Sequence, residues 1–249
     1  MKKLLKLEFT KLRKQKSFYI CTLLAVVFIL LESTLAFVMT NDEPWLREDM
    51  SGIQTMLTGI GSSFYVLLSS VFVVLFFCED HTQQTIKNIL AKGYTKEQVF
   101  AAKVISASAA TTIMFVITEL AALGIGTCFF GLGAVENLDF LAVIGTQYIT
   151  NLANGLMCIV LCAMFRKTAA SIVAMLFIPD LVEMALSLVD TILQNTKILI
   201  SDFWFTSILN DACMERAVSG RMYECLWGSL AYIAIFLLVG TYCYRKQEL

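Results

Sequence analysis

The sequence has few charged residues and few prolines. Only 16% of the 249 residues are charged, whereas a soluble domain usually carries about a quarter. Hydrophobic residues make up 58%, and the mean hydropathy is +0.74. This excess is too large for one soluble core, so lipid must solvate much of the chain. The two prolines fit a mostly helical chain. The composition therefore excludes an ordinary soluble domain and predicts an integral membrane protein.

Motifs for catalysis and cofactor binding are also missing. A GxxxxGK[ST] phosphate loop is absent, so ATP binding by that route is not predicted. The sequence has no CxxC pair, and His81 is its only histidine, which excludes the common Cys/His zinc sites. It has no Ser/His/Asp or Cys/His set, and no basic patch interleaved with aromatic residues. We therefore predict no enzyme activity, no cofactor or metal on this chain and no nucleic-acid partner.

Long apolar runs take the place of these motifs. An α-helix rises 1.5 Å per residue, so a run of about 20 residues crosses a hydrocarbon core about 30 Å thick. The runs lack the two-residue alternation of a membrane barrel. They predict an all-α polytopic membrane protein, a single transmembrane domain over 1–249 with six spans. The spans are expected at about 18–38, 59–78, 104–130, 141–164, 168–190 and 226–244. The run 18–38 has the length of a full span and no small-x-small cleavage site follows it, so we interpret it as a retained helix and not as a signal peptide.

Lys and Arg predict the orientation. With the N-terminus in the cytoplasm, 15 of the 19 basic residues fall in inner segments. The outer segments keep only Arg47, Lys197, Arg216 and Arg221. We therefore expect a multi-pass protein of the plasma membrane with both termini cytoplasmic.

Three segments outside the spans carry further signals. Residues 1–17 mix leucines and Phe9 with lysines, which predicts an amphipathic helix on the inner membrane surface or, alternatively, a solvated basic tail. The inner loop 79–103 has a short apolar stripe that Gly93 can end. The segment 198–209 is apolar but too short to span, which favours a re-entrant or interfacial helix. Cys213 and Cys225 share the same outer loop, and spacing alone leaves a disulfide between them open.

Glycines and acidic residues stand out within the spans. The glycines at 124, 126, 131 and 133 indicate close helix packing or a helix end. Carboxyl groups near the bilayer centre cost about 2.5–3.5 kcal/mol each on insertion scales, so they usually face the bundle interior or water. They favour an acidic pathway for a cationic amphipathic substrate; the alternatives are hydrogen bonds between helices, or spans that end earlier than drawn. These residues are Glu32, Glu119, Asp180 and Glu183. The last two are three residues apart and share one helix face, next to Pro179.

The stretch from Glu79 to Lys103 resembles the first cytoplasmic loop of type-2 ABC exporter permeases. The similarity is greatest to the small six-span subunits of bacterial lantibiotic and antimicrobial-peptide immunity and efflux systems. The matching residues are Glu79, Thr85, Ile86, Lys87, Asn88, Gly93, Thr95, Lys96 and Lys103. Residues 8–19 are similar to the basic Glu-x-x-Lys-x-x-Arg stretch that precedes the first span in this family. Gln84 departs from the pattern, because the family usually has glycine before the threonine.

This resemblance implies a transport mechanism with partners. ATP and Mg²⁺ would bind to a separate P-loop ABC ATPase, expected in two copies, and a second permease would be this chain or a homologue. Residues 82–97 would form a cytoplasmic coupling helix between spans two and three that docks on the ATPase. Its expected coupling residues are Glu79, Thr85, Ile86, Lys87, Asn88, Ile89, Leu90 and Lys96.

Three classes of function remain open at this point. The first is the exporter permease. Its coupling helix is itself an interpretation, because the charged inner loop 79–103 could alternatively be an ordinary loop that follows the positive-inside rule. The second is an ion-coupled secondary carrier, whose expected inverted repeat is not visible. The third is a membrane sensor or scaffold subunit that transports nothing.

Overall fold

The computed structural model describes residues 1–42, 50–59, 63–82, 89, 91–133, 139–193, 199–213 and 222–246. All regular elements in these ranges are helical, as the continuous apolar runs predict. The elements are α1 (Lys2–Lys14), α2 (Lys16–Asp42), α4 (Gly52–Gly59), α5 (Ser63–Thr82), α7 (Lys96–Phe130), α8 (Asp139–Phe165), α9 (Thr168–Leu193), the 3₁₀ turn η1 (Ser201–Phe203), α10 (Phe205–Cys213) and α11 (Met222–Lys246).

Five of the described helices are long and apolar enough to cross a membrane: α2, α7, α8, α9 and α11. They cover five of the six predicted spans. The remaining one, predicted at 59–78, corresponds to α5, whose apolar part Phe64–Glu79 is shorter. The multi-pass character is therefore confirmed, and a membrane crossing by α5 stays a prediction.

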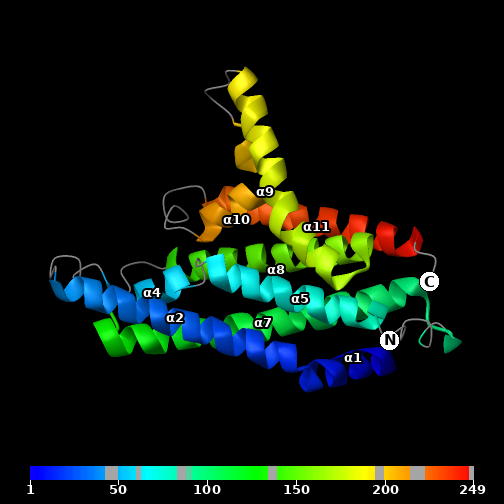
Figure 1. The fold of residues 1–249 in the computed structure, drawn as a ribbon, viewed down its shortest axis with the longest axis horizontal. Helices are drawn as coiled ribbons and strands as arrows, with labels where there is room; N and C mark the ends of the chain where they lie inside the picture. The colour runs from blue at the N-terminus through cyan, green and yellow to red at the C-terminus, as the bar shows by residue number, and fades with distance from the viewer. Residues whose placement is uncertain are drawn as a thin grey trace.

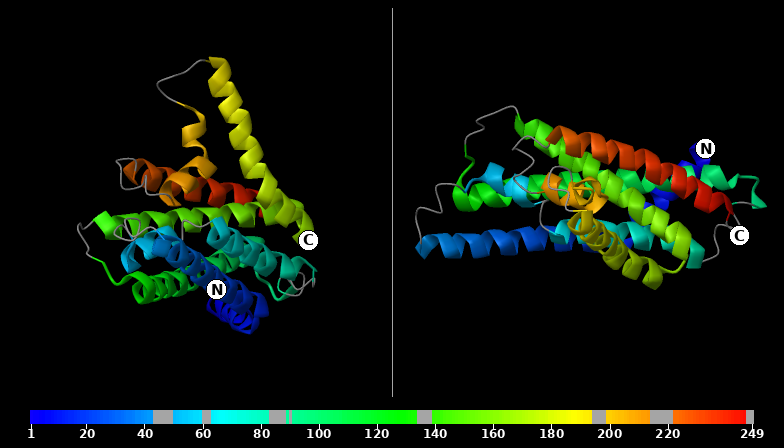
Figure 2. Two further views of the ribbon diagram at one scale, coloured as in Figure 1. Left: turned by 60° about the vertical axis from the view of Figure 1, so that its left-hand side comes forward. Right: turned by 90° about the horizontal axis from the view of Figure 1, so that it is seen from above.

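The long helices form a bundle around α8, which contacts α5, α7, α9, α10 and α11. Figure 1 shows α2, α5, α7, α8 and α11 running along the long axis of the molecule, while α9 leans steeply away from them. Helix α1 and the last turn of α11 lie at the same end of the bundle, as Figure 2 also shows. We call this the basic end, because Lys96, Arg166 and Arg245 also lie where their helices reach it. Whether this end is cytoplasmic stays a prediction.

Helix α1 is separate from α2 because Gln15 adopts an extended conformation. A helix over Lys2–Lys14 thus lies where the sequence predicts the amphipathic helix. Its Leu4 and Leu12 are buried in the core of the bundle, whereas Phe9 is 41% exposed. One stripe of α1 therefore packs on α7, and a position of α1 on the inner membrane surface stays a prediction.

The turn before α7 confirms the helix end predicted at Gly93 and shows a cap at Thr95 that was not predicted from the sequence. Gly93 has a φ of 87°, a value that residues with a Cβ rarely adopt. Thr95 then caps α7 through a capping box, in which its side chain accepts from the Gln98 N–H and the Gln98 side chain accepts from the Thr95 N–H. Helix α7 therefore begins at Lys96, about two turns before the predicted span at 104.

At the end opposite to the basic end, the short helix α4 packs on the last turns of α7. The Gly52 N–H donates to the Gly131 carbonyl at 2.7 Å. A Cβ added at Gly126 would lie 2.6 Å from Thr55 Cβ, so only glycine allows this approach. Gly131 and Gly133 both have a positive φ where α7 ends. Both interpretations of this glycine group, close packing and a helix end, are confirmed.

Candidate functional site

The four acidic residues of the predicted spans occupy three different environments. Glu119 of α7 is 3% exposed, and neither carboxylate oxygen has a hydrogen-bond partner among the described residues. Glu32 of α2 lies on an exposed face, and Glu183 of α9 is half-buried. Asp180 of α9 is exposed like Glu32, and it alone among the four lines the cavity described next. The structure therefore does not gather them into one acidic pathway.

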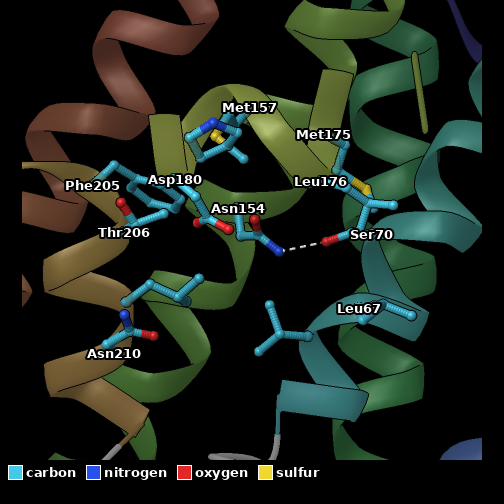
Figure 3. Close-up of a pocket in the computed structure, with 13 residues that line it drawn as sticks. Leu67, Ser70, Asn154, Met157, Met175, Leu176, Asp180, Phe205, Thr206 and Asn210 are labelled. Carbon is cyan, nitrogen blue, oxygen red and sulfur yellow. Dashed lines mark hydrogen bonds between the residues drawn. The ribbon is translucent and has the colours of Figure 1, made fainter. Parts of the chain in front are cut away.

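A cavity of about 470 Å³ lies where α5, α8, α9 and α10 meet (Figure 3). Asp180, Asn154 and Ser70 lie near the middle of their helices, so the cavity is at mid-depth of the bundle. The volume is within the range of about 300–1,000 Å³ that is typical of sites for drug-sized ligands. Its lining consists of Val66, Leu67, Ser70, Asn154, Met157, Met175, Leu176, Pro179, Asp180, Phe205, Thr206, Leu209 and Asn210.

The polar side of this cavity has a fixed arrangement. Asn154 and Ser70 are both buried, and the Asn154 amide nitrogen donates to the Ser70 hydroxyl at 2.7 Å. This bond uses the nitrogen of the amide and leaves its oxygen as an acceptor. The Thr206 hydroxyl is buried and has no hydrogen-bond partner among the described residues. Figure 3 shows Asp180, Asn154 and Thr206 around the same space.

Helices α9 and α10 are held together by side-chain bonds to the backbone. The Trp204 indole N–H donates to the Pro179 carbonyl at 3.0 Å. The Asp190 carboxylate accepts from the backbone N–H groups of Ile200 and Ser201, both at 2.8 Å. Because these bonds lie on both sides of Asp180 along α9, they fix the outer wall of the cavity relative to η1 and α10.

Within the segment 198–209, predicted to be a re-entrant or interfacial helix, residues 201–203 form η1 and residues 205–209 form the start of α10. Phe205 is fully buried against Ala153 and Met157 in the middle of α8. Its ring also lies 5.5 Å from that of Phe236 on α11. The start of α10 is thus level with the middle of two long helices; re-entry into the membrane stays a prediction.

The predicted coupling residues lie at the basic end or outside the described residues. Glu79 is exposed near the end of α5, and Lys96 begins α7. Ile89 is buried in the core of this chain, so its side chain is not available to a partner. The rest of the set is outside the described residues: Thr85, Ile86, Lys87, Asn88 and Leu90.

A second cavity, of about 520 Å³, lies next to these residues. Lys14 and Lys16 from the α1–α2 junction, Glu79 from α5 and Thr168 from α9 contribute to its lining. Close by, Arg245 Nε lies 2.8 Å from a Glu97 carboxylate oxygen, which joins the last turn of α11 to the start of α7. The basic end therefore presents a charged surface built from five helices.

Sequence reasoning missed the uncharged polar residues of the mid-depth cavity. Ser70, Asn154 and Thr206 are uncharged polar residues within mostly apolar segments, and nothing in these segments relates them to Asp180. The spacing of Gln147, Asn151 and Asn154, four and three residues apart in a predicted span, is a sequence signal for a polar helix face. The disulfide between Cys213 and Cys225 that the spacing left open is not tested, because the Cys213 side chain lies outside the described residues.

Comparison with known proteins places this architecture in a family. No curated protein matches the chain. A family model described as "ABC-2 family transporter protein" matches residues 4–179, which is more than half of the chain and extends from α1 to Pro179 in α9. The chain therefore belongs to the ABC-2 family, the membrane-spanning permease subunits of ABC transporters.

Proposed function

We propose that the chain is the permease of an ATP-driven exporter in the plasma membrane and that its cargo is a cationic amphipathic compound, such as an antimicrobial peptide. Membership of the ABC-2 family implies that an ABC ATPase is its partner. Two ATPase copies would work with two permeases, the second being this chain or a homologue. ATP and Mg²⁺ would bind to the ATPase.

The observation that carries the proposal is the surface at the basic end. Glu79, Lys14 and Lys16 line one cavity there, and the start of α7 and the end of α11 lie close by. Charged groups that are spread over several helices suit a partner that must move those helices together, because complementary charges set the register of an interface. The remaining coupling residues that we propose, Thr85, Ile86, Lys87, Asn88 and Leu90, follow α5 in the sequence and lie outside the described residues.

The acidic residues in the helices support a cationic cargo. A carboxylate at membrane depth is retained where it faces water, a cavity or a partner. Asp180 meets this condition because it lines the mid-depth cavity. A secondary carrier could use the same carboxylate for an ion, and a scaffold subunit would need no cavity.

Affinity purification of the chain from native membranes tests the partnership. We expect a P-loop ATPase in stoichiometric amount, identified by mass spectrometry, together with any second permease. Ile86→Asp or Leu90→Asp should release the ATPase. Leu132→Asp is the matched control, because Leu132 is 58% exposed at the opposite end of the bundle and the change in charge is the same. Recovery of the intact permease without any ATPase, in a detergent that preserves complexes, would refute the exporter.

A further inference from the structure

We infer that the mid-depth cavity is a binding site for the ammonium group of an amphiphilic cation, which reaches it from the side of the bundle. The inference rests on the proposed export function and names the chemistry of its cargo. It assigns Asp180 as the counter-ion, and it assigns Asn154 and Thr206 as hydrogen-bond acceptors.

The charge of the lining selects a cation. Asp180 carries the one formal charge among the lining residues, which include no lysine, arginine or histidine. The Asn154 amide oxygen and the Thr206 hydroxyl add acceptors, because the Asn154 nitrogen is engaged by Ser70 and the Thr206 hydroxyl has no partner among the described residues. An ammonium group has three donors and no acceptor, so it matches this set. An anion would meet the Asp180 carboxylate with no compensating positive charge.

The apolar side of the lining selects the body of the ligand. Met157 and Met175 face the cavity with unbranched thioether chains, which adapt to ligands of different shape. Phe205 and Leu209 close the side formed by α10. A bare inorganic ion would leave this apolar surface unused, whereas an amphiphilic cation covers it. The cavity is too small for a whole peptide of 20 or more residues, so a peptide would insert one cationic side chain.

The path to the site runs between α5 and α9. Leu67 and Leu176 line the cavity and are 39% and 41% exposed, so they form its mouth on the lateral face of the bundle. Because the mouth is level with the middle of the long helices, it opens where lipid tails surround a spanning bundle. A ligand can therefore enter from the bilayer without first crossing the protein from either end.

Equilibrium binding to the full chain in lipid nanodiscs tests the site directly. The probe is tritiated 4-phenylbutylammonium, with empty nanodiscs as background. We expect saturable binding that Asp180→Asn weakens about tenfold or more, in keeping with loss of a hydrogen-bonded charge. Glu183→Gln removes the same charge one turn along α9, outside the lining, and should change the affinity less than twofold. The neutral analogue 4-phenylbutanol should compete at least tenfold more weakly than unlabelled probe.

A steric variant keeps the test valid if Asp180→Asn fails to fold. Leu176→Trp places an indole at the mouth and should abolish probe binding. Leu181→Trp, on the 57%-exposed Leu181 of the same helix outside the lining, should leave it intact. Equal losses in Leu176→Trp and Leu181→Trp, or equal losses in Asp180→Asn and Glu183→Gln, would overturn the assignment. So would the absence of saturable binding.

Competition identifies the source of the ammonium group. A cationic amphipathic peptide that displaces the probe only when Asp180 is present indicates a peptide side chain as the ligand. A peptide without effect indicates a small free cation. The assay uses neither ATP nor the ATPase. If the probe does not bind but affinity purification still recovers the ATPase, the binding site is refuted and the exporter is not. If the probe binds but no ATPase is recovered, the exporter is refuted and the binding site is not.

Discussion

The contact between α4 and α7 yields a prediction with a control two residues away. A Cβ at Gly126 would lie 2.6 Å from both Cβ and Oγ1 of Thr55 and 2.9 Å from Cα of Gly52. A Cβ at Gly124, on the same helix, would meet nothing within 4 Å. We therefore expect Gly126→Ala to push α4 away from α7, and Gly124→Ala to leave the packing unchanged.

The magnitude follows from two opposing effects. Replacing a helical glycine with alanine stabilises the helix by about 1 kcal/mol, and both variants gain this. Overpacking costs about 1–3 kcal/mol, and only Gly126→Ala incurs it, because its contacts are backbone atoms and a Cβ that cannot rotate away. Gly124→Ala should thus be more stable than Gly126→Ala by roughly 1–3 kcal/mol. At about 2–4 °C per kcal/mol for a chain of this size, the midpoints should differ by roughly 2–12 °C.

Thermal unfolding in detergent, followed by size-exclusion chromatography of the heated samples, measures this difference. A second substitution identifies its cause. Thr55→Gly removes the two closest of the three contacting atoms and leaves Gly52 Cα, so it should restore part of the loss in a Gly126→Ala background, whereas Thr55→Ala keeps the Cβ and should restore less. Equal midpoints for Gly124→Ala and Gly126→Ala would show that α4 does not seat on α7 as described.

Three further substitutions test separate features. Glu119→Met should stabilise the fold by about 1–3 kcal/mol in the same unfolding assay, because it removes a buried carboxylate whose oxygens have no hydrogen-bond partner among the described residues; a loss of stability would reveal a partner for this group. Arg166→Gly should stabilise by about 1 kcal/mol because Arg166 has a φ of 59°, a left-handed conformation that costs a residue with a Cβ; Lys167→Gly, the neighbouring control, should not raise the midpoint. Arg245→Ala should change stability by less than about 1 kcal/mol at physiological salt, because both side chains of its ion pair are more than half exposed; a larger effect would mean that water does not reach this pair.

The long helices, the amphipathic α1 and the turn glycines could be predicted from the sequence. These features depend on local properties. An apolar run of spanning length must satisfy its own backbone hydrogen bonds in lipid, and a helix does so within the run. A positive φ at Gly93 or Gly131 and a capping box at Thr95 likewise depend on residues within one or two turns. The basic segments around the spans predicted two chain ends on one side, and the structure brings both to one end of the bundle.

The composition of the candidate site was decided by the tertiary structure. Glu32, Glu119, Asp180 and Glu183 looked alike in the sequence, because a helix that is apolar on all sides gives no periodic signal for its inner face. Packing makes Glu119 buried and Glu32 exposed, and it places Asp180 in a cavity with Asn154 and Thr206. Those three residues come from three helices, and their meeting depends on α10 reaching the middle of α8. Such an arrangement is a property of contacts between distant segments, so no single stretch of sequence contains it.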